Sequence, residues 1–340
     1  MVDNMQQHQP IYINGNDEFH KIAMAEGWKG DGTVSNPYII ENLIIDAKRV
    51  KSYCIGIENT DVYFVITHCV CHHAVYKLPH EGCGIYLYNV KHGKLVNNVC
   101  HGNTQSGIYL WNSSDNIISN NICWNNGQYG IKVDNSSNNI INCNICIRNG
   151  KNGIYCQSAC NNIISQNVVY RNKYSNLLLD ANSNNNIVIS NVCIDAMKSD
   201  GIVVYEASNN ILIYNNCLYS ESHGIRISIS PSYNILAHNM CMNNKYGGIQ
   251  LFRAYNTVIV NNISIKNRRG ITLQFDVTYS TISNNVYVGN SDAGIVLAEP
   301  YISNNNFAYN ICANNNEEFS IQQGVDLTTN KIVYNTKQPK

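Results

Sequence analysis

Residues 107–121 read GIYLWNSSDNIISNN and residues 130–144 read GIKVDNSSNNIINCN, so one pattern returns after 23 residues. Each copy starts with glycine, alternates apolar and other residues, and then reaches two isoleucines followed by a corner rich in asparagine. Alternation of this kind indicates a β-strand with one buried face. Three short apolar segments per copy, separated by Gly and Asn, predict a three-sided coil. Asparagine suits the corners because it tolerates left-handed backbone and bonds to nearby main chain.

The repeat can be followed along most of the chain. Its leading position is held by Gly84, Gly107, Gly130, Gly153, Asn176, Gly201, Gly224, Gly248, Gly270 and Gly294, and Gly56 is an earlier copy, 28 residues before Gly84. Repeat proteins grow by adding coils, so the usual link between length and domain number does not apply. The pattern predicts an all-β, single-stranded, right-handed parallel β-helix of the pectate-lyase type. We expect about 10–11 coils of ~23 residues.

The ends of the chain depart from the repeat. Asn16, with two acidic residues after it, predicts a short helix that stops at Gly27. Because an open coil exposes core and strand edges, such a helix is expected to cap the first coil. We therefore expect a cap and lead-in over residues 1–36, the β-helix over 37–316, and a C-terminal cap or tail over 317–340.

Asparagines and cysteines recur at fixed places in the repeat. A stacked column is predicted for Asn98, Asn121, Asn144, Asn167, Asn191, Asn215, Asn239, Asn262 and Asn285. A second column follows two residues later, with Val169 and Ser264 in place of cysteine in two coils: Cys71, Cys100, Cys123, Cys146, Cys193, Cys217 and Cys241. A position that accepts Val and Ser indicates packing rather than reactivity, and we expect reduced thiols.

Composition narrows the function. Charged residues are 14% of the chain and the formal net charge is zero, so the positive field that draws proteins to nucleic acid is missing. No apolar run is long enough to span a membrane. The first ten residues lack an apolar signal-peptide core, so the sequence leaves localisation open between the cytoplasm and export with a signal removed.

The two quoted coils resemble the repeats of carbohydrate-binding and sugar-hydrolysis domains, best known from NosD-type β-helices. The segment GWKGDGTVSNPYIIENLIID, residues 27–46, resembles the lead-in of archaeal members. The resemblance covers roughly residues 28–312 and implies the fold. That group includes polysaccharide lyases, hydrolases, epimerases and a copper-delivery accessory protein. No catalytic motif of a known lyase or epimerase can be carried over to this chain.

The outward positions of the strand after the repeat glycine are rich in aromatic and charged residues. Exposed aromatic rings present flat apolar surfaces on which sugars stack. The predicted substrate-binding residues are Tyr86, Tyr88, Tyr109, Trp111, Tyr155, Gln157, Tyr205, Glu206 and Arg226. Asp134 and Asp180 are predicted as a catalytic pair two coils apart, about 9.6 Å, with Lys132 and Arg226 to neutralise a uronate. The competing interpretation is aromatic packing between strands and solvated acids.

A second candidate site is rich in histidine and cysteine. Residues 68–73 read HCVCHH, and the repeat accounts for Cys71 and His72. The repeat does not explain four further residues, which predict a metal site: His68, Cys69, His73 and His80. Imidazole and thiolate favour zinc or copper. Calcium stays a further candidate ion, and the sequence fixes no cofactor.

Three functions follow from these features. The first is binding, and in one form processing, of a poly- or oligosaccharide, as a lyase or glycoside hydrolase if the protein is an enzyme. The second is a non-catalytic structural or surface solenoid used for adhesion. The third is metal handling through the region from His68 to His73. Flat sheet faces also favour oligomers.

Overall fold

The computed structural model describes residues 5–49, 53–77, 82–299, 301–325 and 327–338. The chain divides into two compact units, residues 1–168 and 169–340. We describe each unit by itself; strand β19 (Val168–Tyr170) contains the boundary.

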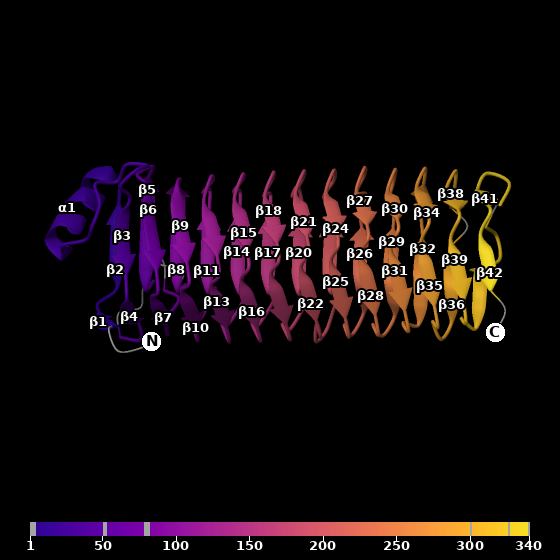
Figure 1. Cartoon of the computed structure of the whole chain (residues 1–340), viewed down its shortest axis with the longest axis horizontal. Helices are drawn as coiled ribbons and strands as arrows, with labels where there is room; N and C mark the ends of the chain where they lie inside the picture. The colour runs from indigo at the N-terminus through magenta and orange to yellow at the C-terminus, as the bar shows by residue number, and fades with distance from the viewer. Residues whose placement is uncertain (1–4, 50–52, 78–81, 300, 326, 339–340) are drawn as a thin grey trace. The chain divides into compact units, whose positions relative to one another are not determined.

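The first unit is a three-sided coil of parallel strands (Figure 1). Among its described residues each side has six strands. Sheet A contains β1 (Gln6–His8), β4 (Leu43–Asp46), β7 (Val70–His72), β10 (Val99–His101), β13 (Ile122–Trp124) and β16 (Ile145–Ile147). Sheet B contains β2 (Ile11–Asn14), β5 (Ile55–Thr60), β8 (Ile85–Val90), β11 (Ile108–Trp111), β14 (Ile131–Asp134) and β17 (Ile154–Gln157). Sheet C contains β3 (Tyr38–Glu41), β6 (Phe64–Thr67), β9 (Gly93–Val96), β12 (Ile117–Ser119), β15 (Ile140–Asn142) and β18 (Ile163–Ser165).

The second unit repeats this plan with seven described strands on each side. Sheet A contains β22 (Val192–Ile194), β25 (Asn216–Leu218), β28 (Met240–Met242), β31 (Ile263–Ile265), β35 (Val286–Val288), β39 (Ile311–Ala313) and β42 (Thr336–Gln338). Sheet B contains β20 (Leu177–Asp180), β23 (Ile202–Tyr205), β26 (His223–Ser228), β29 (Gly247–Phe252), β32 (Arg269–Gln274), β36 (Ala293–Leu297) and β40 (Glu317–Ile321). Sheet C contains β21 (Ile187–Ile189), β24 (Ile211–Ile213), β27 (Ile235–Ala237), β30 (Val258–Val260), β34 (Thr281–Ser283), β38 (Asn306–Ala308) and β41 (Lys331–Val333). A short pair joins β33 (Val277–Thr278) to β37 (Ile302–Ser303).

The N-terminal helix α1 (Asn16–Glu26) forms where the sequence predicts it and ends at Gly27 in left-handed geometry. Its buried Phe19 stacks on Tyr38, with ring centroids 4.9 Å apart. In Figure 1 the helix lies at the indigo end of the chain, beside β2. Strand β2 precedes the helix and already pairs with β5.

The coil extends further in both directions than the glycine pattern indicates. At the N-terminal end the extension is β2, which pairs with β5. At the C-terminal end, β40, β41 and β42 add one more strand to each sheet. The solenoid therefore has more turns than the expected 10–11. The added coils were missed because IYIN at residues 11–14 and EEFSI at residues 317–321 lack the leading glycine.

The expected columns form inside the coil. Cys100 is the register partner of both Cys71 and Cys123 in the first unit, and Cys217 pairs with both Cys193 and Cys241 in the second. All of them are fully buried. None of the chain's 14 cysteines, all of which lie in the described residues, is in a disulfide. The column is a packing site, as predicted.

The predicted asparagine ladder is present, and two further ladders accompany it in the first unit. In each ladder the side-chain Nδ2 of one asparagine donates to Oδ1 of its equivalent in the next coil, at 2.9–3.2 Å: Asn98–Asn121–Asn144–Asn167, Asn103–Asn126–Asn149 and Asn116–Asn139–Asn162. The left-handed backbone belongs instead to the preceding residue, such as Asn97 (φ 58°) and Asn120 (φ 55°). The two uses of asparagine at corners therefore fall on neighbouring residues.

The leading glycine is required by close stacking. A Cβ on Gly107 would lie 2.8 Å from the carbonyl oxygen of Gly130 and 2.9 Å from Cβ of Cys123. The assignment of Gly56 as an earlier copy is wrong. Gly56 pairs with Tyr86, not with Gly84, and its missing side chain makes room for the ring of Tyr53.

Candidate functional site

The outer face of sheet B in the first unit carries two parallel rows of side chains, set by the strand register. The first row is Tyr12, Gly56, Tyr86, Tyr109, Lys132 and Tyr155. The second row is Asn14, Glu58, Tyr88, Trp111, Asp134 and Gln157. Adjacent members are one strand spacing apart, about 4.8 Å.

The expectation that all the aromatic rings of this face are exposed is wrong for Tyr86, Tyr109 and Tyr155. Each is on the outer side of the sheet, but only 3%, 6% and 8% of their surfaces are exposed. Tyrosine rings from the turns before sheet B cover two of them: Tyr53 stacks on Tyr86 at 4.6 Å, and Tyr129 stacks on Tyr155 at 4.7 Å. Lys132 lies over the ring of Tyr109. Tyr53, Tyr86 and Tyr109 thus form part of a small apolar cluster outside the coil.

The second row keeps an open aromatic surface. Trp111 is 39% exposed, and its ring centroid lies 5.1 Å from that of half-buried Tyr88. Glu58 is the neighbour of Tyr88 in this row, and it accepts a hydrogen bond from the Tyr12 hydroxyl at 3.1 Å. At the far end Gln157 Oε1 accepts from the Tyr155 hydroxyl at 3.1 Å. Acceptors and amides therefore flank two adjacent rings.

Lys132, Asp134 and Tyr109 form one connected polar group next to Trp111. Lys132 Nζ lies 2.7 Å from Asp134 Oδ2, and the Tyr109 hydroxyl donates to the same oxygen at 3.0 Å. The ammonium also lies 4.2 Å from the centre of the Tyr109 ring. The second carboxylate oxygen, Asp134 Oδ1, is buried and has no hydrogen-bond partner among the described residues.

The second unit brings together Asp200, His223 and Arg226. Asp200 is 1% exposed. Its Oδ1 lies 3.0 Å from His223 Nδ1, and its Oδ2 lies 3.3 Å from Arg226 Nε. The sequence predicts Arg226 as a substrate-binding residue. In the structure its guanidinium forms an ion pair with Asp200. Asp200 and His223 were missed because each directly precedes a repeat glycine, outside the alternating strand positions.

Acid should weaken the second unit through Asp200. Burial by itself raises the pKa of this carboxyl, but the His223 hydrogen bond and the Arg226 charge outweigh burial and hold the pKa at about 2, below the ordinary 3.8. A lowered folded-state pKa stabilises the fold above about pH 4, and this contribution is lost as the pH falls from 4 to 2. We expect it to amount to about 2 kcal/mol.

The measurement is guanidinium unfolding at several pH values, compared between the wild type and Asp200→Asn. The variant should lose less stability than the wild type between pH 4 and pH 2. Asp195→Asn is the matched control, because Asp195 pairs with Arg171 at the surface, at 2.7 Å. Equal pH dependence in the wild type and Asp200→Asn would show that Asp200 has no lowered pKa.

The other predicted residues of the second unit also lie on sheet B. Asp180 ends β20, and its Oδ1 accepts from the backbone N–H of Ala181 at 2.9 Å. Tyr205 ends β23, and the negative charge of Glu206 raises its pKa. The catalytic pairing of Asp134 with Asp180 joins residues of different units and stays a prediction.

Among the described residues, the predicted metal ligands His68, Cys69 and His73 do not form one cluster. His68 bonds to its neighbour Thr67, with 2.8 Å between Nδ1 and Oγ1. Cys69 is 1% exposed, and burial raises the pKa of its thiol to about 11. His80 lies outside the described residues. His73 alone joins a cluster, with Asp46 and His72. Both partners were missed, Asp46 because it lies a coil away and His72 because the repeat explained it.

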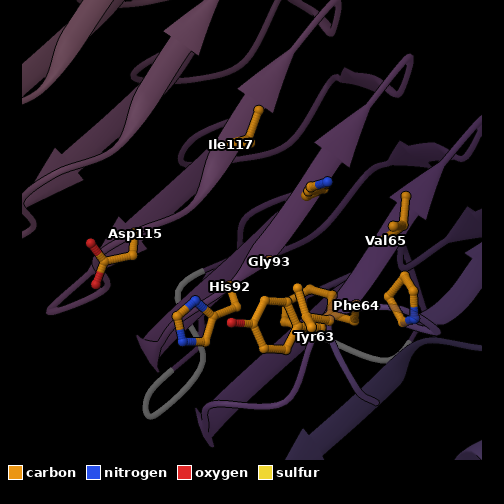
Figure 2. Close-up of a pocket in the computed structure, with 10 residues that line it drawn as sticks. Tyr63, Phe64, Val65, His92, Gly93, Asp115 and Ile117 are labelled. Carbon is orange, nitrogen blue, oxygen red and sulfur yellow. The ribbon is translucent and has the colours of Figure 1, made fainter. Parts of the chain in front are cut away.

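A small pocket lies on sheet C of the first unit (Figure 2). Figure 2 shows the ring of Tyr63 beside that of His92, and the two stack with centroids 4.4 Å apart. Asp115, Lys94 and Val34 contribute to the lining. Its volume of about 170 Å³ is below the roughly 300–1,000 Å³ of typical small-molecule sites. An extended sheet face offers more binding surface than this pocket.

Comparison with known proteins assigns the fold family. The family model described as a right handed beta helix region matches residues 27–192 and 175–337. The chain belongs to this family, which confirms the predicted fold and its right-handed coil. The search of curated proteins found no match to the chain. Among the described residues, no helix combines the length and apolar character needed to cross a bilayer.

Several solved structures share the fold at low identity. A periplasmic alginate epimerase matches with a TM-score of 0.58 and 14% identity, covering 94% of this chain and 86% of its own. The A-module of a mannuronan C-5 epimerase from Azotobacter vinelandii matches with a TM-score of 0.57 and 14% identity, covering 94% of both chains. The catalytic domain of an α-1,3-glucanase bound to nigerose matches with a TM-score of 0.52 and 12% identity, covering 98% of this chain and 62% of its own. At such identities the likeness concerns the fold.

Proposed function

We propose that this β-helix binds a polysaccharide on the outer face of sheet B in the first unit. The observation that carries the proposal is the open pair Tyr88–Trp111 beside the Lys132–Asp134–Tyr109 group. An exposed indole ring next to a half-buried phenol is a surface on which a sugar ring can stack. The exposed amide of Gln157 and the half-buried carboxylate of Glu58, in the same row as the two rings, can bond to sugar hydroxyls.

The second row suits a chain-like ligand. Its members repeat at the strand spacing, so a polymer lying across the strands meets Glu58, the two rings, Asp134 and Gln157 in turn. The resemblance to carbohydrate-binding repeats and the epimerase and glucanase structures of the same fold support this choice of ligand. Lys132 is a candidate to face an acidic sugar, although Asp134 already balances its charge.

Binding is favoured over hydrolysis by the spacing of the acids in this row. Glu58 and Asp134 are three strands apart in register, or roughly 14 Å. An inverting pair of carboxyl groups is about 6.5–9.5 Å apart and a retaining pair about 5–5.5 Å. Processing of the polymer by Asp134 with Lys132 is the second candidate, and the contact between Lys132 Nζ and Asp134 Oδ2 at 2.7 Å next to Trp111 is the observation that favours it.

The test compares Trp111→Ala with Trp124→Ala on immobilised neutral and uronate-containing oligosaccharides. Trp124 is the matched control because it is 37% exposed, against 39% for Trp111, but lies on sheet A. We expect Trp111→Ala to weaken binding about tenfold, or ~1.4 kcal/mol, and Trp124→Ala to leave it unchanged. Absence of binding by the wild type, or equal losses in the two variants, would reject the proposal.

A further inference from the structure

Asp46, His72 and His73 bring three metal-binding atoms together on the outer side of sheet A. Asp46 ends β4 and is the register partner of His72, which ends β7. His73 follows in left-handed backbone geometry, with φ 57°. Consecutive residues of a strand point to opposite faces. The left-handed turn brings the two imidazoles to the same side instead.

The distances between these atoms suit one shared ion. Nδ1 of His72 lies 2.9 Å from Nδ1 of His73, which lies 3.2 Å from Asp46 Oδ1. The third separation, between His72 Nδ1 and Asp46 Oδ1, is 3.8 Å. Metal–ligand bonds of about 2.0–2.2 Å place neighbouring donors roughly 3.0–3.5 Å apart. A small displacement of side chains would bring all three atoms into a first coordination sphere.

We propose that these three residues bind a divalent transition-metal ion, with zinc as the best match. Two imidazoles and one carboxylate are a donor set used by zinc and by non-haem iron. Three protein donors leave at least one coordination position for water or another ligand, as in catalytic rather than structural zinc sites. The proposed site is on a different sheet from the sugar-binding face.

The surroundings hold two of the donors in place. The backbone N–H of Lys48 donates to Asp46 Oδ1 at 3.1 Å. The His101 ring stacks on His72 at 5.1 Å, and Trp124 stacks on His101 at 4.7 Å. Groups of this kind orient metal ligands and raise affinity. The repeat explains the His72–His101 stack, but it requires neither Asp46 nor His73.

Open space adjoins the cluster. Asp46 also lines a solvent-open pocket of about 730 Å³, together with Gln7, His8, Gln9, Lys48 and Arg49. This pocket gives an ion and its water ligands access to the carboxylate. Lys48 and Arg49 would favour an anion as the exchangeable ligand.

The test is titration of the full-length chain with Zn²⁺ by calorimetry and with Co²⁺ by absorption spectroscopy. Asp46→Asn and His73→Ala are the variants of choice, because both side chains are nearly half exposed and the fold should tolerate the changes. His68→Ala is the control, since His68 lies outside the cluster. Circular dichroism checks that each variant keeps the wild-type strand content.

We expect one ion per chain in the wild type and in His68→Ala. Each cluster variant should lose at least about tenfold in affinity, since loss of an outer-shell partner alone costs 10–100-fold. The Co²⁺ spectrum should lack the sulfur charge-transfer band that thiolate ligands produce. A cysteine-type spectrum, or unchanged affinity in His73→Ala, would overturn the proposal. Asp46→Asn should leave sugar binding unchanged, so this proposal and the carbohydrate proposal fail independently.

Discussion

Replacing Asn121 with alanine is expected to destabilise the first unit by about 3–5 kcal/mol. Its fully buried side chain makes four hydrogen bonds. Oδ1 accepts from the backbone and side-chain nitrogens of Asn98, both at 3.0 Å. Nδ2 donates to the Leu95 carbonyl at 2.8 Å and to Asn144 Oδ1 at 3.0 Å. Alanine leaves these partners buried and unsatisfied, in a place that water does not reach.

Guanidinium unfolding followed by circular dichroism measures the effect. The control is Asn120→Gly. It removes the exposed amide of the neighbouring residue, and glycine adopts the left-handed φ of 55° at this position without strain. The control should change the free energy of unfolding by less than about 1 kcal/mol. If the two variants unfold at the same denaturant concentration, the ladder does not contribute to stability as inferred.

Tyr287 gives two substitutions with opposite expected signs. The side chain is fully buried, stands in the cysteine column between Ser264 and Cys312, and its hydroxyl has no hydrogen-bond partner among the described residues. Tyr287→Phe removes the unsatisfied hydroxyl and should stabilise the second unit by about 1–3 kcal/mol. Tyr287→Ala leaves a cavity and should cost about 3–5 kcal/mol.

The same unfolding experiment applies, with Tyr279→Phe as control because Tyr279 is 63% exposed and should be insensitive to loss of its hydroxyl. A destabilised Tyr287→Phe variant would mean that the hydroxyl has a partner, for example a buried water. In that case the predicted sign of the change in the free energy of unfolding is wrong.

Most of the coil could be predicted because its period is visible in the residue types themselves. Glycine marks the place where backbones approach, and Cys, Val and Ser mark one buried position, which Tyr287 occupies in a later coil. The terminal coils could not be predicted, since they share the strand register without the glycine. Gly56 was wrongly assigned for the opposite reason. It is a glycine, but its missing side chain makes room for the ring of Tyr53 and not for the backbone of the next coil.

The candidate site was only partly predictable. Register correctly placed Trp111 and Asp134 in one outward row, because alternation fixes which side of a strand a residue occupies. It could not show that Tyr53 and Tyr129 fold back over the first row, since residues in turns have no fixed direction. The same limit hid the Asp46–His72–His73 cluster, which depends on one left-handed backbone angle at His73.

The asparagine ladders also have a chemical consequence for how the protein ages. Asn126 and Asn149 precede glycine, the sequence in which asparagine deamidates most readily through attack of the next backbone nitrogen on its side chain. Here the Gly127 N–H is held by the Asn103 carbonyl at 2.8 Å, and Nδ2 of Asn126 is held by the Cys100 carbonyl and by Asn149 Oδ1. The folded coil thus restrains both reacting groups. Conversion of Asn126 to aspartate would set an acceptor against the Oδ1 of Asn149, so chemical damage at this position would remove one ladder bond between neighbouring coils.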